Sequence, residues 1–422
     1  MDTVYMRYGG GEVSFSLPDG CRVTTLEAGP YPAIDDLPDA FSRAISDECV
    51  DSPPLASLLS AEDSVTIVVS DITRSWMRQD AIIRLLMDLF ERIGIPDERV
   101  TILIAIGTHR KQSEDEMRRI VSPEIYRRVR VVNHDCDAED LVYVGTTRLG
   151  TRVTVNPLVL GRKVILIGGT VHHLMSGFGG GRKSIVPGVS ARATVYQNHR
   201  HALAPRAARS NEAIGMGVLE GNPIHEDMLE AAYFVNPAFG VNLVVRDGRF
   251  LAICCGHWRS AWEKSCRIAH AVFGVPIAEQ SDIVIASCGG YPRDIDLYQG
   301  AKSLLNASQA VRPGGALVFL AECGEGGGPE EFFGWIDSLC RGTLDMDLRA
   351  DFTIAGYIFY AACEAISRAK TYMLTGIDSA LLAPMRVHAG TDLGELLGAI
   401  DFSGKTVCLM PMAGNTMPYM KR

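Results

Sequence analysis

The sequence predicts an α/β fold, with two α/β domains that each contain a mainly parallel sheet. Short apolar runs rich in β-branched residues, such as residues 65–69 and 100–105, indicate strands that are buried on both faces. Amphipathic segments of helical length, such as residues 79–93, separate these runs, and polar or glycine-rich loops follow them. This alternation is typical of parallel sheets covered by helices. We expect the active site in a cleft between the two domains.

The composition is that of a globular protein with two or three domains. The chain has 422 residues, of which 47% are hydrophobic and 22% are charged. No apolar run reaches the roughly 18 residues of a membrane span, and the first residues lack the apolar core of a signal peptide. The 11 cysteines form no Cys-x-x-Cys pair, which favours reduced thiols and a cytoplasmic location. The formal net charge of −9 argues against nucleic acid as a partner.

Polar side chains follow two of the predicted strands. Asp71, Thr73 and Arg74 come just after residues 65–69, and open α/β sheets bind ligands beyond the carboxyl ends of their strands. Alternatively, Asp71 caps the next helix by binding its first N–H groups. His109 follows the strand at residues 100–105 in the run Gly-Thr-His-Arg, where a single histidine could also be purely structural.

A glycine-rich loop at residues 168–188 follows a buried strand and dominates the middle of the chain. Its glycines let the backbone approach a ligand closely, and such loops often present N–H groups to an anion. His173 and Lys183 lie in the loop, and His199 follows on a predicted helix. The P-loop and dinucleotide-binding patterns both fail, because Arg182 stands where each needs a glycine. A structural turn is the alternative.

The remaining elements follow from apolar periodicity and from turn residues. In the first domain we expect a hairpin at residues 4–8 and 12–17; helices near 38–45, 113–128, 189–201, 223–234 and 257–272; and strands near 129–132, 141–144, 164–167, 241–246 and 249–254. His225 is expected to be a solvated residue on one of these helices, and Trp262 a core residue.

The second domain is predicted to begin near Pro276, so that the domains comprise residues 1–274 and 275–409. Its predicted strands are near residues 281–287, 316–320, 387 and 406–410, and its helices near 296, 329–340, 355–369 and 393–400. Gln299 and Lys302 share one helix face, because they are three residues apart. They form either a surface pair or a substrate contact, in which Lys302 and Arg74 could hold a carboxylate.

Taken alone, these residues offer acid/base and metal-binding groups. His109 and His173 are candidate acid/base imidazoles, because an unperturbed histidine exchanges protons near neutral pH. Lys183 is suited to covalent attachment or to charge pairing. His199 could bind a metal such as nickel through a ring nitrogen.

The motifs resemble those of the nickel-pincer-nucleotide lactate racemase family over nearly the whole chain. The family pattern around the glycine loop is filled by His173, Gly177, Phe178, Gly180, Gly181, Lys183, Pro187, Gly188 and His199. Three further motifs follow in the family's order: Asp-x-Thr-Arg at residues 71–74, Gly-Thr-His-Arg at 107–110 and Tyr-Gln-x-x-Lys at 298–302.

The resemblance implies a cofactor, the nickel-pincer nucleotide Ni(II)-pyridinium-3,5-bisthiocarboxylate mononucleotide. Lys183 would be joined to it through a thioamide, and His199 would be a nickel ligand. Asp71, Thr73 and Arg74 would contact the cofactor. Arg74, Gln299 and Lys302 would lie at the substrate. The tail at residues 410–422 would return to the first domain.

The implied activity is that of a racemase or epimerase acting on a small-molecule 2-hydroxy acid. His109 or His173 would remove the hydroxyl proton while the Cα hydrogen leaves as hydride to the cofactor. Cofactor-synthesis proteins would be partners, and a homodimer is compatible with the resemblance. Two alternatives stay open: a non-catalytic protein that binds the pincer nucleotide, and an enzyme with pyridoxal on Lys183. No tryptophan follows Trp335, so Tyr357 is the candidate for the tryptophan that some family members place beside the substrate.

Overall fold

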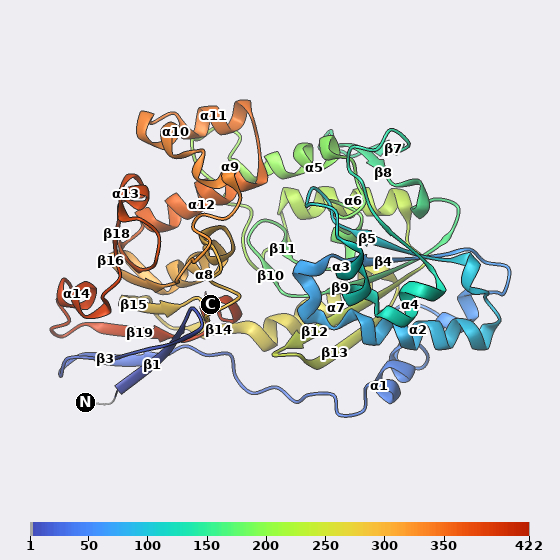
Figure 1. Ribbon diagram of the computed structural model, residues 1–422, viewed down its shortest axis with the longest axis horizontal. Coiled ribbons are helices and arrows are strands. Elements are labelled where there is room, and N and C mark those ends of the chain that lie inside the picture. Colours follow the sequence, from blue (N-terminus) through green and yellow to red (C-terminus); the bar gives the residue numbers. More distant parts are fainter. Residues whose placement is uncertain (1–2, 422) are drawn as a thin grey trace. The chain divides into compact units, whose positions relative to one another are not determined.

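The computed structural model describes residues 3–421, which fall into two compact units (Figure 1). Unit 1 contains the N-terminal residues to Gly29, the segment Ala202–Asn211 and the chain from Val272 onward. Unit 2 contains Pro30–His201 and Glu212–Ala271. Each unit has a six-stranded sheet whose strands are mainly parallel. The predicted α/β fold class is therefore confirmed.

The sheet of unit 2 has the order β13-β12-β9-β4-β5-β6, and only the β12–β13 pair is antiparallel. Its strands are β4 (Val65–Ser70), β5 (Val100–Ala105), β6 (Arg130–Asn133), β9 (Lys163–Gly169), β12 (Phe239–Arg246) and β13 (Arg249–Gly256). The chain runs from β4 to β6 in one direction and adds β9, β12 and β13 on the other side of β4. Loops leave β4 and β9 in opposite directions at such a switch point, which opens a crevice at their carboxyl ends.

Seven helices and two small hairpins complete unit 2 within the described residues. The helices are α1 (Leu37–Ala44), α2 (Gln79–Ile93), α3 (Glu114–Val121), α4 (Pro123–Arg128), α5 (Arg192–His199), α6 (Pro223–Val235) and α7 (Trp258–Phe273), the last ending in unit 1. The hairpins are β7 (Val142–Thr146) with β8 (Arg152–Val155), and β10 (His172–His173) with β11 (Gly177–Phe178). Short 3₁₀ helices are η1 (Leu55–Leu58), η2 (Ile72–Met77), η3 (Asp97–Arg99), η4 (Pro157–Val159), η5 (Gly181–Ser184) and η6 (Arg200–Ala202).

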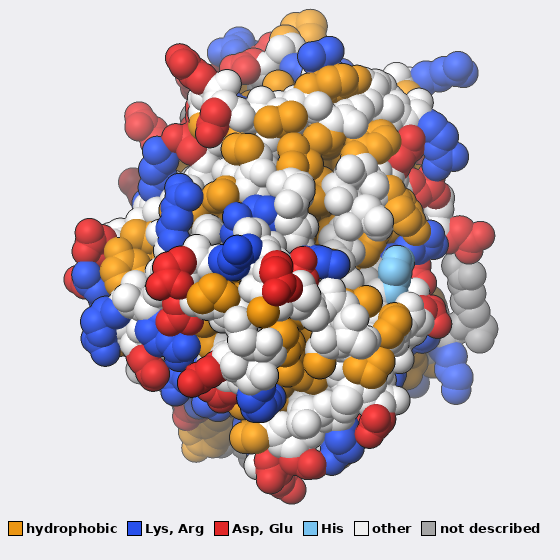
Figure 2. All heavy atoms as spheres, turned by 90° about the vertical axis from the view of Figure 1, so that its right-hand side faces the viewer, with side chains coloured by type: hydrophobic (Ala, Val, Ile, Leu, Met, Phe, Trp, Pro, Cys, Tyr) orange, Lys and Arg blue, Asp and Glu red, His pale blue; other side chains and the backbone are white. Residues whose placement is uncertain are grey.

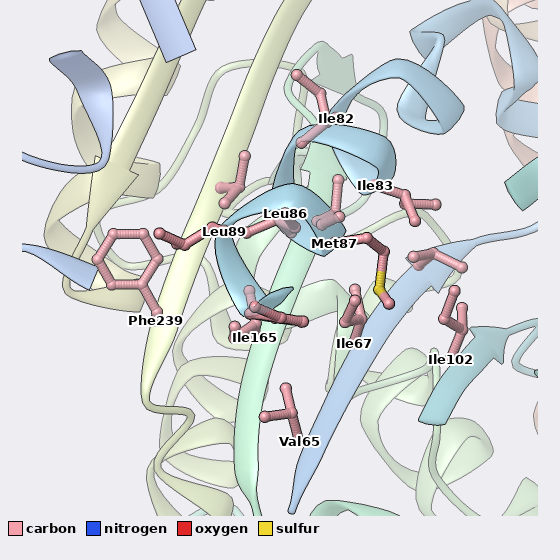
Figure 3. Packing of buried hydrophobic residues seen from close by; sticks show 14 of the residues in the cluster. Val65, Ile67, Ile82, Ile83, Leu86, Met87, Leu89, Ile102, Ile165 and Phe239 are labelled. Carbon is pink, nitrogen blue, oxygen red and sulfur yellow. The ribbon is translucent and has the colours of Figure 1, made fainter. Parts of the chain in front are cut away.

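Helix α2 packs against one face of this sheet. Figure 3 shows the apolar side of α2 over the central strands, with side chains from β4, β5, β9 and β12 beneath it. The labelled residues, all buried, are Val65, Ile67, Ile82, Ile83, Leu86, Met87, Leu89, Ile102, Ile165 and Phe239. Fully burying one such side chain contributes about 1.5–3 kcal/mol. The strands that carry the site loops are thereby fixed in place.

The sheet of unit 1 has the order β18-β17-β16-β15-β19-β3, with every neighbouring pair parallel. Its strands are β3 (Arg22–Thr25), β15 (Ser281–Ser287), β16 (Val311–Leu320), β17 (Lys370–Leu374), β18 (Val387–Gly390) and β19 (Thr406–Met410). The pairs β1 (Thr3–Tyr8) with β2 (Gly11–Ser16) and β14 (Gly274–Ile277) with β20 (Met417–Met420) lie outside it. The other elements are α8 (Leu297–Ala310), α9 (Glu330–Phe333), α10 (Ile336–Arg341), α11 (Leu344–Ala350), α12 (Ile354–Ser367), α13 (Ser379–Leu382), α14 (Leu393–Gly398), η7 (Ala383–Met385) and η8 (Ala413–Asn415).

The units differ from the expected domain ranges at both ends of the chain. The start of the chain belongs to unit 1, because β3 pairs with β19. The tail also belongs to unit 1, because β20 pairs with β14. Residues 1, 2 and 422 of the expected ranges lie outside the described residues. All residues of β3 are exposed, so no apolar pattern pointed to this long-range pairing.

Local elements mostly match the expected ones. The predicted helix at residues 113–128 is two helices, because Ser122 has a φ of 82° and Pro123 begins α4. Ser122 cannot continue α3 with that backbone.

None of the helices in residues 3–421 has the length and apolar character needed to span a membrane. On the face shown in Figure 2, basic and acidic side chains are intermixed.

Candidate active site

All predicted site residues of unit 2 except His199 lie on segments that leave three neighbouring strands. Asp71, Thr73 and Arg74 follow β4, His109 follows β5, and the glycine loop follows β9. Since β9, β4 and β5 are adjacent and parallel, these loops leave the same edge of the sheet. The Gly107 N–H donates to the Gly188 carbonyl at 3.0 Å, which ties the His109 loop to the glycine loop.

Asp71 and His109 form a close pair. His109 Nδ1 lies 2.5 Å from one Asp71 carboxylate oxygen, and the other oxygen accepts from the Thr73 N–H and hydroxyl. Burial raises the pKa of Asp71, but the hydrogen bonds and charges of its neighbours, with those of His109 the largest, together lower it overall. A carboxylate on Nδ1 fixes the ring and leaves Nε2 for proton exchange. The sequence analysis did not predict this contact.

His173 and Lys183 also meet. Lys183 Nζ lies 2.8 Å from His173 Nε2. The N–H groups of Met175 and Ser176 point at His173 Nδ1, at 3.2 and 3.3 Å. Nδ1 therefore accepts from the backbone, and Nε2 is the ring nitrogen that faces the Lys183 amine. The structure therefore brings together the two residues that were predicted for acid/base chemistry and covalent attachment.

His199 is buried on α5 and has a defined tautomer. Its Nδ1 lies 2.9 Å from the Val195 carbonyl, which can only accept, so Nδ1 carries a proton. Burial, assisted by the charge of Lys183, lowers the pKa of His199 to about 3. The ring is therefore neutral at pH 7, and its lone pair is on Nε2. A neutral imidazole nitrogen is the form that binds a metal ion.

Thr73 and Arg74 lie beside the Asp71–His109 pair. Arg74 is half-buried, and one of its terminal nitrogens contacts the Thr73 carbonyl at 3.4 Å and hydroxyl at 3.3 Å. Asp71 accepts from Thr73 N–H, so it also caps η2. The cap alternative for Asp71 is thus partly right, but the cap belongs to η2 and not to α2.

Gln299 and Lys302 belong to unit 1. They lie near the start of α8, where the Asp296 side chain accepts from the Gln299 N–H. Lys302 Nζ donates to Gln299 Oε1 at 3.1 Å, which confirms that they share a helix face. Tyr357 is almost fully buried, and its hydroxyl donates to Ser210 Oγ at 3.2 Å. Burial raises the pKa of Tyr357, so its hydroxyl is uncharged.

The groups in unit 2 fit a nickel-pincer nucleotide. Lys183 offers an amine at the end of the glycine loop, and His199 offers a lone pair for nickel. Residues 3–421 contain no cluster of three or more His, Cys, Asp or Glu side chains able to hold a metal ion. The cofactor implied by the resemblance would need only one such ligand from the protein, because it would bind nickel through its own sulfur and carbon atoms.

The roles of two residues at the loop were missed by the sequence analysis. Arg182, which lies in the loop, was noted because it breaks two loop patterns, and its side chain is fully buried. His225, expected to be solvated, is 7% exposed and accepts from Arg182. Its position three residues before the buried Met228 on α6 was the available signal, since that spacing shares a helix face. Trp262 is buried, as predicted.

Comparison with known proteins gives consistent matches. The model of the lactate racemase N-terminal domain matches residues 8–211, and that of the lactate racemase C-terminal domain matches residues 277–346. The chain is 31% identical over 341 residues to a lactate racemase of Thermoanaerobacterium thermosaccharolyticum, covering 79% of this chain and 78% of the relative. It is 29% identical over 292 residues to a lactate racemase of Lactiplantibacillus plantarum, covering 68% and 66%.

A solved structure agrees with the sequence matches. The lactate racemase apoprotein from T. thermosaccharolyticum superposes with a TM-score of 0.87 at 26% identity, covering 99% of this chain and 100% of that one. The similarity thus extends over both units and includes the strand-end loops described above. The chain belongs to the lactate racemase family.

Proposed function

We propose that this protein is a racemase or epimerase of a 2-hydroxy acid that uses a covalently bound nickel-pincer nucleotide. The observation that carries the proposal is the contact between His173 and Lys183, 2.8 Å apart at the end of the glycine loop. The related proteins named lactate racemase support the reaction class. When bound, the cofactor would supply the acceptor and donor for the Cα hydride.

Lys183 and His199 are the residues that would hold the cofactor. Lys183 would provide the amine of a covalent link, and His199 would bind nickel through Nε2. The neutral, Nδ1-protonated form of His199 supports this role, because the metal-binding nitrogen needs no deprotonation. Asp71, Thr73 and Arg74 are proposed to lie along the cofactor.

His109 and His173 are the proposed acid/base residues, one for each enantiomer. Each would take the hydroxyl proton in one direction and return it in the other. The Asp71 carboxylate holds the His109 ring in place by a charge-assisted hydrogen bond of 2.5 Å to Nδ1. The two N–H groups on His173 occupy Nδ1, which leaves Nε2 as the nitrogen that would exchange a proton with the substrate. General acid/base catalysis of this kind typically contributes about 10²–10⁴-fold.

The substrate carboxylate is proposed to bind Arg74, Gln299 and Lys302. Lactate, malate, a branched or aryl hydroxyacid, or a sugar acid would each present the same carboxylate and hydroxyl groups. Loading would require the proteins that synthesise the nickel-pincer nucleotide. A non-catalytic binding protein would have no need of the Asp71–His109 pair, which supports catalysis over storage.

The test is a panel of 2-hydroxy acids given to enzyme co-expressed with cofactor-synthesis proteins and followed by chiral chromatography. At least one acid should racemise or epimerise, and protein expressed without those partners should be inactive. His109→Asn should retain nickel but lose turnover. Nickel-loaded protein that converts none of the acids would favour the binding-protein alternative, and pyridoxal absorbance without nickel would favour the Schiff-base alternative.

A further inference from the structure

Arg182 is a buried cation directly beside Lys183 in the chain. Its side chain is fully buried, and none of the acceptors of its hydrogen bonds among residues 3–421 is a carboxylate. Burial lowers the pKa of Arg182 to about 9, so it still carries its charge at neutral pH. A buried charge is costly unless it is compensated by hydrogen bonds. The contacts of Arg182 therefore show which groups compensate for the burial of its charge.

Those contacts are mainly to the backbone of the glycine loop. One terminal nitrogen donates to the Phe178 carbonyl at 2.8 Å, and the other donates to the Ser176 carbonyl. Nε donates to His225 Nδ1 at 3.1 Å. The guanidinium carbon lies 4.0 Å from the centre of the Trp262 ring. The planar group thus binds in three directions and stacks on an indole.

Side chains from helices α6 and α7 contact both Arg182 and the glycine loop. Burial, followed by the charges of Arg182 and Arg259, lowers the pKa of His225 to about 3, so its ring is a neutral acceptor. Trp262 Nε1 donates to the Gly179 carbonyl at 2.8 Å. Gly181 has a φ of 53°, and a Cβ there would lie 2.4 Å from Trp262 Cγ. The loop backbone is therefore packed directly on these side chains.

We propose that Arg182, bound by His225 and Trp262, is a positioning residue that holds the glycine loop so that Lys183 faces His173. Arg182 and Lys183 are consecutive in η5, and consecutive side chains of a 3₁₀ helix point about 120° apart. Anchoring the Arg182 side chain thus fixes the rotation of η5 and the direction of Lys183. The carbonyls of Ser176 and Phe178, bound by the same group, fix the segment after His173. The consequence for cofactor loading rests on the proposed function.

The first experiment measures the loop in the apoprotein, by hydrogen exchange of the amides of Met175, Ser176, Gly179 and Lys183. Arg182→Lys keeps the positive charge but loses the planar guanidinium, which donates to several acceptors at once. Arg182→Met loses both the charge and these donors. Both should accelerate exchange in the loop at least tenfold, with little change elsewhere in unit 2. His225→Phe keeps the ring against Trp262 and removes one acceptor, so its effect should be smaller and it serves as the milder variant.

Arg162→Lys is the matched control. Arg162 also donates to backbone carbonyls, those of Val65 and Arg99, but it precedes β9 and so lies at the opposite edge of the sheet. This variant should leave exchange in the loop unchanged. Uniformly faster exchange throughout unit 2 in the Arg182 variants would mean that Arg182 only stabilises the fold, and unchanged exchange in the loop would overturn the proposal.

The second experiment measures covalent loading by intact mass after co-expression with cofactor-synthesis proteins. The initial rate of adduct formation should fall at least tenfold in Arg182→Lys and stay near that of wild type in Arg162→Lys. If wild-type protein forms no adduct while the Arg182 variants still loosen the loop, the proposed function fails and the positioning role stands. If Arg182→Lys loads at the wild-type rate, the positioning role is wrong.

Discussion

The two units share one plan but place different chemistry at the same edge of their sheets. In unit 2, the loops beyond β4, β5 and β9 carry two pairs of contacting side chains, Asp71 with His109 and His173 with Lys183. In unit 1, the loop beyond β15 carries Asp294, whose carboxylate accepts the N–H groups of Gly9 and Glu322 at 2.8 and 3.2 Å. Cys288 of the same loop is buried, and burial raises its pKa to about 12.

This difference shows that loops at equivalent positions in two similar sheets can carry different chemistry. Both sheets reverse their strand order, at β4/β9 in unit 2 and at β15/β19 in unit 1, so both provide the usual place for a ligand. In unit 1 the polar groups of that loop tie backbone segments together, and the predicted substrate residues lie on α8. In unit 2 the polar groups are paired with each other. The fold supplies the place, and the residues decide the chemistry.

The largest expected effect separates the two lysines. Lys183→Ala should abolish the covalent adduct, because no other amine is predicted to form the link, whereas Lys302→Ala should load normally. Intact mass spectrometry of protein co-expressed with cofactor-synthesis proteins measures both. An adduct that persists in Lys183→Ala would show that Lys183 is not the attachment point. The two units would then not differ in the role of their lysines.

The second prediction concerns the carboxylate behind His109. Asp71→Asn should lower kcat by about 10²–10⁴-fold, since it removes the carboxylate that orients the His109 ring through Nδ1. Nickel content should be unchanged, because His199 is the proposed ligand. Paired assays of racemisation and bound nickel test this, and normal turnover would mean that His109 is not an acid/base residue.

The third prediction concerns the substrate carboxylate. Arg74→Ala and Lys302→Ala should each lower kcat/KM for every acid converted, because truncating one partner of a desolvated charge pair costs about 2–5 kcal/mol. Gln299→Ala should have a smaller effect, since it removes no charge. Steady-state kinetics decide the matter, and unchanged kcat/KM in both charged variants would exclude this pair from substrate binding.

The smallest effect concerns acid stability. Within residues 3–421, the histidines whose pKa is lowered by burial all lie in unit 2: His134, His172, His199, His225 and His270. The folded pKa of His225 is about 3. An unfolded histidine titrates near 6.5. The unfolded state therefore binds the additional proton between these values, and stability falls as the pH falls from about 6.5 toward 3.

His225→Phe removes one titrating group from that balance. Between pH 4 and 6, the dependence of unfolding free energy on pH should be lower in this variant by about 1.4 kcal/mol per pH unit. Urea titrations followed by the fluorescence of the buried Trp258 and Trp262 measure it. Identical slopes would show that His225 binds a proton equally in both states.

Elements with a complete local pattern could be predicted from the sequence. The bounds of α2, β5 and β19 match, because each is a continuous apolar or amphipathic segment. β3 could not be predicted, because its exposed residues show no apolar pattern and its place depends on pairing with β19.

The same distinction applies to the site. That His109 and Asp71 lie at strand ends followed from local sequence, but their 2.5 Å contact depends on β4 and β5 being neighbours. The role of His225 was missed because it depends on the packing of α6 against the glycine loop, far away in the sequence.

The most direct test of the central claim follows the Cα hydrogen of the substrate during racemisation in deuterium oxide. If that hydrogen is transferred as hydride within the site of unit 2, it does not exchange with solvent. NMR after full racemisation should then show the original hydrogen at Cα in both enantiomers, while His109→Ala and His173→Ala should each abolish racemisation. Substantial deuterium at Cα would instead indicate proton abstraction by two bases, and would contradict the pincer-cofactor account of this site.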